Sequence, residues 1–365
     1  MQKLKVTILY DAVEDDVKAE EEAKGNPTPL VSEEIEAVLR ERGHTVRRLA
    51  ARGTALDLAK QIQDDDSDII FNVCESFHGV NDKEQNVAAL LELSGKVFTG
   101  SGSLGLSLAQ DKGLTKKLLG FHGISTPKFA VMENSTVDHA DDINFPMFVK
   151  PANADASIGI DNKSVVRNVK ELMERISYIE TEFDAPALIE EFIDGRELFV
   201  AVLDGHKPEA LPIVEWDLSG VPEGAPKIAG TEVKWDKSNA ANQTPLGFPS
   251  DLPEPVYTAL QAAAVEAFRA LRLRDYGRVD VRLRKRSDAK ADDPLEGYEF
   301  FIIEVNPNPH LAGDAELPAA AKKSGLDYGD LIERIIAHAI SRGQRQSPPE
   351  IAAATLEAAN EDAAA

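Results

Sequence analysis

Residues 300–307 read Phe-Phe-Ile-Ile-Glu-Val-Asn-Pro, and residues 277–281 read Gly-Arg-Val-Asp-Val. Each segment has the length and apolar composition of a buried strand, yet each carries an acidic side chain. Side chains alternate along a strand, so Glu304 and Asn306 share a face, and an antiparallel partner would add Asp280. A single such carboxylate is usually solvated or ion-paired, but a charge within an apolar run is costly unless paired or metal-bound. Two carboxylates and an amide oxygen suit Mg²⁺, which prefers oxygen ligands and bridges phosphates.

Basic residues stand at positions suited to phosphate groups. Arg278 shares a strand face with Asp280, and an arginine there can hold a transferring phosphate. Lys112 follows an aspartate near the start of a predicted helix, and Lys150 ends the predicted strand 146–149, just before a proline. Lysine ammonium groups neutralise phosphates, although an isolated lysine is more often a surface residue.

A stretch of small residues follows Lys150. Residues 152–160 read Ala-Asn-Ala-Asp-Ala-Ser-Ile-Gly-Ile, and such a turn would let backbone N–H groups approach a phosphate. A plain hairpin, with arms over 158–160 and 163–166, is the commoner explanation.

A second strand-turn-strand segment lies further along the chain. Strands are predicted over 187–193 and 197–203, and Asp-Gly-Arg between them has hairpin spacing. This layout can present backbone groups to an adenine edge, and Glu197 can accept hydrogen bonds from ribose hydroxyls. Without the other motifs, an ordinary hairpin explains the segment equally well.

Composition excludes several classes of protein. The chain has 365 residues, 40 Lys+Arg and 63 Asp+Glu, a net charge of −23 that disfavours nucleic acid and anionic membranes as partners. No stretch approaches the roughly 18 apolar residues of a membrane span. The only cysteine, Cys74, excludes an internal disulfide and any multi-cysteine metal site. We therefore expect a cytoplasmic protein, of two or three domains at about 150 residues each.

Periodicity indicates how these segments are organised. Strands over 6–10, 44–49 and 68–73 alternate with helices in the first hundred residues, which predicts a small parallel sheet. An acidic run at 11–24 follows the first strand. A single helix is predicted over 107–119. Later elements are predicted as helices at 32–43, 54–63, 84–93, 169–183, 256–271 and 327–340, with a long polar loop at 219–249.

Taken together, these motifs resemble the ATP-grasp superfamily, and within it the D-alanine–D-alanine ligase family. They occur in family order between about residues 70 and 340, and are Phe98–Gly102, Gln110–Lys116, Phe148–Pro151, Glu190–Glu197, Gly277–Asp280 and Glu304–Asn306. The fold class that this resemblance implies is α/β and α+β, an ATP-grasp fold with an N-terminal parallel-sheet pre-grasp domain. The expected divisions are that pre-grasp domain, a central subdomain, a C-terminal subdomain and a disordered tail, over 1–100, 101–185, 186–342 and 343–365 respectively.

The resemblance also implies roles for individual residues around an ATP molecule held between the last two subdomains. Lys112, Lys150 and Ser157 would bind phosphates. Glu190, Glu191 and Ile193 would surround adenine, with Glu197 on the ribose. Asp280, Glu304 and Asn306 would hold Mg²⁺, with Mn²⁺ as an alternative, while Arg278 and Lys234 would contact the reacting phosphate.

The implied reaction joins a small-molecule carboxylate to an amine. The carboxylate attacks the γ-phosphate of ATP to give an acylphosphate, which the amine then attacks, so the site works by positioning and electrostatics. We expect no nucleic acid or membrane partner, and a homodimer is left open.

The amino-acid half departs from the family pattern. No glycine turn follows the first strand, although Glu14 can replace the family glutamate that holds the first substrate's amine. Pro-Asn-Pro-His at 307–310 replaces a Pro-Gly turn, and Ala315 replaces a serine that binds the acceptor carboxylate. The neighbouring acids Asp314 and Glu316 would repel a free carboxylate, so we predict an acceptor other than plain D-alanine.

Two further residues and two further functions stay open. His310 is a candidate acid or base at the acceptor, or a structural turn residue. Glu75 follows the third predicted strand, where α/β sheets place ligands, and is a weaker candidate for substrate binding. The alternatives to a new ligase are a non-catalytic, regulatory ATP-binding protein and a true D-alanine–D-alanine ligase.

Overall fold

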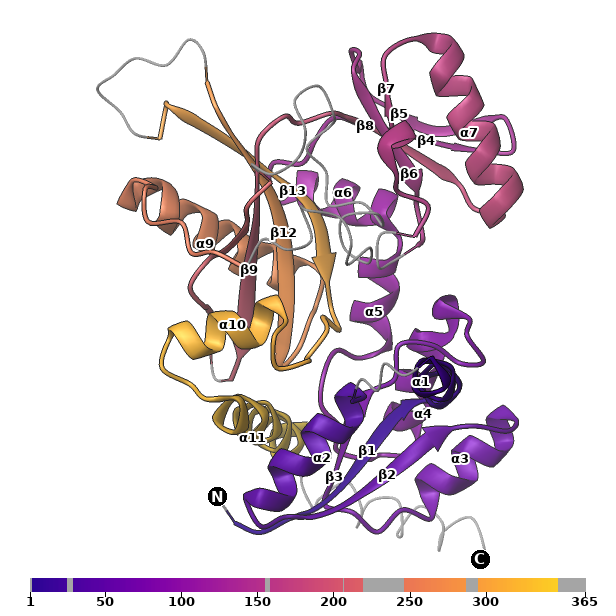
Figure 1. The fold of residues 1–365 in the computed structure, drawn as a ribbon, viewed down its shortest axis with the longest axis vertical. Helices are drawn as coiled ribbons and strands as arrows, with labels where there is room; N and C mark the ends of the chain where they lie inside the picture. Colours follow the sequence, from indigo (N-terminus) through magenta and orange to yellow (C-terminus); the bar gives the residue numbers. More distant parts are fainter. Residues whose placement is uncertain are drawn as a thin grey trace, which may run out of the picture.

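The computed structural model describes residues 2–24, 29–154, 158–205, 207–218, 246–286 and 295–346 (Figure 1). Within these residues the strands form three sheets. One sheet lies in the N-terminal part at the bottom of Figure 1, and the other two face each other above it. No described helix combines the length and apolar character needed to cross a bilayer.

The N-terminal sheet is parallel, as predicted, with strand order β2-β1-β3. Both faces of β1 are covered, because Ile8 packs in the core beside α2 and Leu9 packs in the core beside α3 and α4. The elements are β1 (Lys5–Asp11), α2 (Val31–Glu41), β2 (Thr45–Ala51), α3 (Ala55–Gln63), β3 (Ile69–Val73), the 3-10 turn η1 (Asn81–Lys83) and α4 (Glu84–Leu93).

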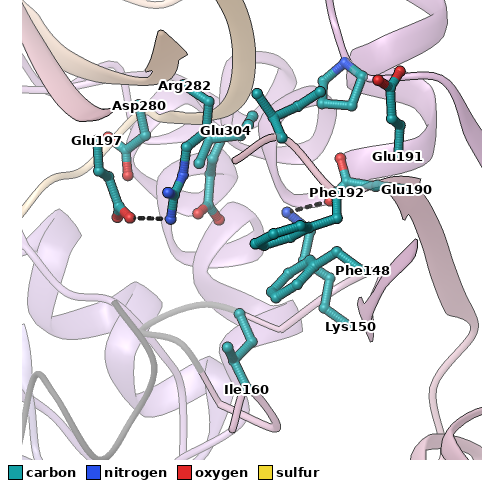
Figure 2. A pocket seen from close by; sticks show the side chains of 13 residues that line it. Phe148, Lys150, Ile160, Glu190, Glu191, Phe192, Glu197, Asp280, Arg282 and Glu304 are labelled. Carbon is teal, nitrogen blue, oxygen red and sulfur yellow. Dashed lines mark hydrogen bonds and ion pairs between the residues drawn. The ribbon is translucent and has the colours of Figure 1, made fainter. Parts of the chain in front are cut away.

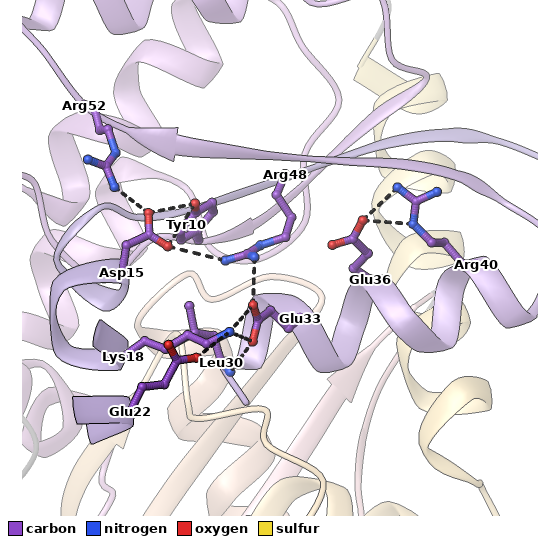
Figure 3. A network of polar contacts seen from close by, with 10 residues as sticks. All are labelled: Tyr10, Asp15, Lys18, Glu22, Leu30, Glu33, Glu36, Arg40, Arg48 and Arg52. Carbon is purple, nitrogen blue, oxygen red and sulfur yellow. Dashed lines mark hydrogen bonds and ion pairs between the residues drawn. The ribbon is translucent and has the colours of Figure 1, made fainter. Parts of the chain in front are cut away.

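The acidic run after the first strand folds into a helix, α1 (Val13–Ala23). Figure 3 shows that Arg48 and Arg52 lie beside Asp15 of this helix and that Lys18 pairs with Glu33 of α2. Lys18 Nζ lies 2.6 Å from Glu33 Oε1, and Arg48 Nη1 donates to the same oxygen at 3.2 Å. Arg48 also lies 3.8 Å from Asp15, so it links α1 to α2 and β2.

The prediction of one helix over 107–119 is wrong. The chain forms α5 (Ser103–Gln110) and α6 (Lys112–Phe121), with a break at Asp111. The Asp111 side chain accepts a hydrogen bond from Leu114 N at 2.8 Å and so caps the second helix. Lys112 therefore becomes the first residue of α6.

The central sheet has the order β5-β4-β8-β6-β7, and helix α7 packs on one face. The predicted hairpin over 158–160 and 163–166 does not form, because β7 pairs with β6 instead. Asp161 caps the intervening turn, and the buried Arg175 donates to Asp161 at 3.1 Å. The elements are β4 (Phe129–Glu133), β5 (Thr136–Ala140), β6 (Met147–Pro151), η2 (Asn162–Ser164), β7 (Val165–Val166), α7 (Val169–Phe183) and β8 (Ala187–Glu191).

The C-terminal sheet has the order β10-β9-β12-β13, and β11 also pairs with β9. Helix α9 covers one face, while α10 and α11 cover the other and share a core with the N-terminal sheet. The elements are β9 (Arg196–Asp204), β10 (Pro208–Ala210), β11 (Val214–Trp216), α9 (Glu254–Ala270), β12 (Tyr276–Lys285), β13 (Tyr298–Asn306), α10 (Glu316–Lys323) and α11 (Tyr328–Gln346).

The sheets correct one predicted pairing. β8 and β9 are not a hairpin, since β8 is the middle strand of the central sheet and β9 belongs to the C-terminal sheet. Residues 192–195 therefore carry the chain from one sheet to the other, and the expected domain divisions stay a prediction. Helix α11 reaches Gln346, so the expected tail begins later than residue 343, and the rest of it lies outside the described residues.

Candidate active site

A cleft opens between the central and C-terminal sheets, where residues 192–195 cross between them (Figure 2). Its walls combine apolar side chains with charged ones from both sheets. The lining residues are Pro127, Phe148, Lys150, Ile160, Glu190, Glu191, Phe192, Ile193, Glu197, Asp280, Arg282, Ile303 and Glu304. A mixed pocket of this kind is the usual form of a nucleotide site.

A β-bulge in β13 shapes the end of the cleft where the predicted metal ligands lie. The strands β12 and β13 pair antiparallel, with Asp280 opposite Glu304, and the register shifts immediately beyond this pair. The extra residue is Ile303, so Ile303 and Glu304 both line the cleft. The bulge also explains why Ile302 and Val305, three positions apart, pack in the same core beside α9.

Cations hold the two carboxylates. Arg278 donates to both oxygens of Asp280, at 2.7 and 3.0 Å, and its other arm donates to Glu316 at 3.0 Å. Lys112 Nζ lies 2.9 Å from Glu304 and donates to the Ala154 carbonyl at 2.6 Å. The neighbouring carboxylates raise the pKa of the Arg278 guanidinium against the opposing effect of burial. Arg278 therefore stays charged beside Asp280, a predicted metal ligand.

The side-chain oxygens of Asp280, Glu304 and Asn306 fit Mg²⁺ if further oxygen ligands complete its coordination. Asn306 lies opposite Arg278 on the neighbouring strand, and its buried Nδ2 has no hydrogen-bond partner among the described residues. No group of three or more His, Cys, Asp or Glu in those residues is arranged to hold a metal. A cation here would depend on Asp280, Glu304, the Asn306 amide and phosphate oxygens, the mixed ligation that Mg²⁺ commonly has.

At the opposite end of the cleft, a buried carboxylate lies between two lysines. Lys150 Nζ is 2.9 Å from Glu190 Oε2, and Lys116 pairs with Glu190 Oε1. The adjacent Glu191 lies 3.1 Å from Arg284. Sequence reasoning missed Lys116, although its position four residues after Lys112 on one helix placed both on the same face.

Glu197, the expected ribose ligand, has a cross-strand partner. Arg282 stands opposite it in the register of β9 and β12, and the two form a buried ion pair. Arg282 also donates to the Gly195 carbonyl at 3.1 Å, which ties the crossing segment to the C-terminal sheet. Arg282 was not predicted from the sequence, although it follows Asp280 by two residues and therefore lies on the same face of the strand.

Glu14 and Glu75 come together at the end of the N-terminal sheet. Burial, with the nearby charges of Glu75 and Asp11, raises the pKa of Glu14 to about 8. Its Oε2 is buried without a hydrogen-bond partner among the described residues. The role of Glu14 in holding a substrate amine stays a prediction.

Replacing Glu14 with Gln is expected to raise the melting temperature, by an amount that grows as pH rises from about 5 to about 8. In the folded state Glu14 stays protonated up to about pH 8, whereas an unperturbed glutamate ionises near pH 4.5. Between these pH values the Glu14 carboxyl releases its proton only when the chain unfolds. Rising pH therefore stabilises the unfolded state of the wild type, and Gln removes this effect. An increase of about 3 °C or more near pH 8 is expected from scanning calorimetry. The control is E20Q, on the exposed face of the same helix. A pH-independent difference would contradict the result.

The turn that follows β13 is tied to both flanking domains. Tyr276 donates to Asn308 at 2.8 Å, and Asn308 donates to Glu84 of α4 at 3.0 Å. His310 follows this turn, where its side chain reaches solvent and desolvation by the surrounding protein lowers its pKa. The charges of Glu316, Asp314 and Glu34 act against this shift.

The structure therefore brings most of the predicted site residues to one cleft. Lys150, Glu190, Glu191, Ile193, Glu197, Asp280 and Glu304 line it, while Arg278 and Lys112 contact its carboxylates. Ser157 and Lys234 lie outside the described residues. The roles assigned to all of these residues stay predictions.

The sequence was compared with protein families and with known proteins. The profile of a family described as the D-ala D-ala ligase C-terminus matches residues 117–337. A D-alanine–D-alanine ligase of Marinomonas sp. is 35% identical over 88% of this chain and 92% of its own length. The ligase of Syntrophotalea carbinolica is 35% identical over 78% and 83%. The chain belongs to the D-alanine–D-alanine ligase family.

The chain is also similar to an uncharacterized protein and to a solved structure. An uncharacterized protein of Sinorhizobium fredii, y4sG, is 33% identical over 85% of this chain and 87% of its own length. The D-alanine–D-alanine ligase of Bacillus anthracis, solved in complex with ATP, superposes with a TM-score of 0.70 at 21% identity and covers 94% of this chain and 100% of its own. The predicted family and the predicted ATP-grasp fold class are both confirmed.

Proposed function

We propose that this member of the D-alanine–D-alanine ligase family is an ATP-dependent ligase that joins a carboxylate to an amine through an acylphosphate. Family membership and the ATP-grasp fold support an ATP-dependent enzyme that forms C–N bonds. The observation that carries the proposal is the convergence of Arg278, Asp280, Glu304 and Lys112 at one end of the cleft. These groups can hold a phosphoryl group and offset its negative charge.

In this proposal the adenine end lies between Phe148 and the crossing segment, with Glu197 toward the ribose. Lys150 and Lys112 would exchange their carboxylate partners for phosphate oxygens when ATP binds. Mg²⁺, held by Asp280, Glu304 and Asn306, would supply charge neutralisation at the phosphates. Arg278 would orient the phosphoryl group toward the substrate carboxylate.

The same geometry supports an acceptor different from D-alanine. Arg278 donates to Glu316 at 3.0 Å, and position 315, where the family pattern has a serine for the acceptor carboxylate, is an alanine. Asp314 and Glu316 add negative charge near His310. An amine that carries no neighbouring carboxylate suits this surface better than an amino acid does.

The experiment is phosphate release from ATP across a matrix of carboxylates and amines, with mass spectrometry of the products. We expect release to require one of each class, and the product to contain a new amide bond. D-alanyl-D-alanine formed from D-alanine alone, at a rate typical of the family, would favour the true D-alanine–D-alanine ligase. No release with any pair, despite ATP binding, would favour a non-catalytic ATP-binding protein.

Its setting is also part of the proposal. We propose a cytoplasmic enzyme acting on small molecules, because a free thiol such as the buried Cys74 suits a reducing compartment. A homodimer remains open, and analytical ultracentrifugation of the purified chain tests it.

A further inference from the structure

Three charged side chains are buried together behind the adenine end of the cleft. Lys116 comes from α6, Lys150 from β6 and Glu190 from β8, and they are only 2%, 4% and 2% exposed. Lys150 Nζ lies 2.9 Å from one oxygen of Glu190, and Lys116 pairs with the other oxygen. The Glu190 carboxylate is thus paired with two ammonium groups.

The two lysines differ in what else they can reach. Lys150 and Glu190 line the cleft, whereas Lys116 is not among the lining residues and pairs with the other oxygen of Glu190. The ring of Phe129 lies 5.7 Å from Lys116 Nζ and adds a weak attraction to the ammonium. Of the two lysines, Lys150 is therefore the one placed to meet a ligand in the cleft.

A buried carboxylate without a partner is strongly disfavoured, so Glu190 resists losing its last cation. With a single lysine as partner, that lysine would be bound to Glu190 and poorly able to leave. With Lys116 as a second partner, Glu190 keeps a counter-ion when Lys150 moves away.

We propose that Lys116 is a positioning residue that remains paired with Glu190 and so releases Lys150 to bind a phosphate of the nucleotide. This inference rests on the proposed function, in which ATP occupies the cleft. Burial lowers the pKa of Lys116, and the charge of Glu190 acts against that shift.

The test measures binding to the full-length protein by titration calorimetry, with two ligands. One is the non-hydrolysable analogue AMP-PNP with Mg²⁺, and the other is adenosine, which has no phosphate. The variant K116M should raise the Kd for AMP-PNP about tenfold while changing the Kd for adenosine less than about twofold. The matched control is K117M, since Lys117 is the next residue on α6 and pairs with Asp138 at the surface.

A double variant separates positioning from simple damage to the fold. The double variant K116M/E190Q is compared with E190Q, because Glu190 itself lines the cleft. Without the carboxylate that would retain Lys150, the K116M change should alter the Kd for AMP-PNP by less than about threefold relative to E190Q. If K116M weakens adenosine and AMP-PNP equally, or if it weakens AMP-PNP about tenfold in the E190Q background as well, the inference is wrong.

Binding also keeps this test distinct from the proposed function. If the wild-type protein binds AMP-PNP but joins no carboxylate to any amine, the ligase proposal fails and the Lys116 inference is still decided by the two Kd values. Where turnover is found, K116M should raise KM for ATP and leave kcat within about twofold, since Lys116 touches no reacting atom.

Discussion

The variant E304Q should lose at least about a thousandfold in kcat/KM for ATP-dependent phosphate release in the presence of both substrates. Gln keeps the shape of the side chain but removes the charge that, in our proposal, holds Mg²⁺ together with Asp280. The apparent Mg²⁺ requirement should rise about tenfold or more, because one anionic ligand is missing. Titration of Mg²⁺ at saturating ATP measures this effect.

The matched control for this variant lies on the same strand. E299Q changes a half-buried glutamate of β13 that pairs with Arg284 at 2.8 Å, and it should keep kcat/KM within about threefold of wild type. Because Lys112 retains the Ala154 carbonyl as an acceptor, E304Q should also fold normally. Full activity of E304Q with an unchanged Mg²⁺ requirement would remove Glu304 from the metal site.

Local pattern was sufficient to predict the strands that carry this site. The apolar run around Glu304 and the alternation from Arg278 to Asp280 placed the charged residues on one face, and the antiparallel register puts Asp280 opposite Glu304. The bulge at Ile303 was not predictable, because a bulge depends on how two strands meet rather than on either one alone.

Long-range pairing explains the other differences. The segment 187–203 has the spacing of a hairpin, but β8 finds its partners in β4 and β6, so the turn becomes a crossing between sheets. The helix predicted over 107–119 breaks because Asp111 caps a new helix, and a single aspartate in a helical pattern rarely signals this. Lys116 acquires a role only when β8 brings Glu190 beside α6.

Replacing Arg278 with Met should produce the largest combined loss of stability and activity. The Arg278 side chain is only 11% exposed, and its guanidinium holds Asp280 and Glu316 through three hydrogen bonds of 2.7–3.0 Å. Without it, two carboxylates lose their shared cation, which should lower the free energy of unfolding by about 3–5 kcal/mol at neutral pH. The control R334M removes a surface arginine paired with Glu209 and should cost less than about 1 kcal/mol.

The pH dependence of R278M identifies the cause of its instability. Carboxylates that lose a cation in the folded state have raised pKa values, so they bind protons that the unfolded state has already released. Their cost is therefore greatest above the raised pKa and disappears as pH falls below the unfolded value of about 4. Urea unfolding should show R278M approaching the wild type between about pH 7 and pH 4. A constant difference across this range would mean that lost packing, rather than unpaired charge, destabilises the variant. It would also weaken the proposal that Arg278 is the cation that binds the transferred phosphate.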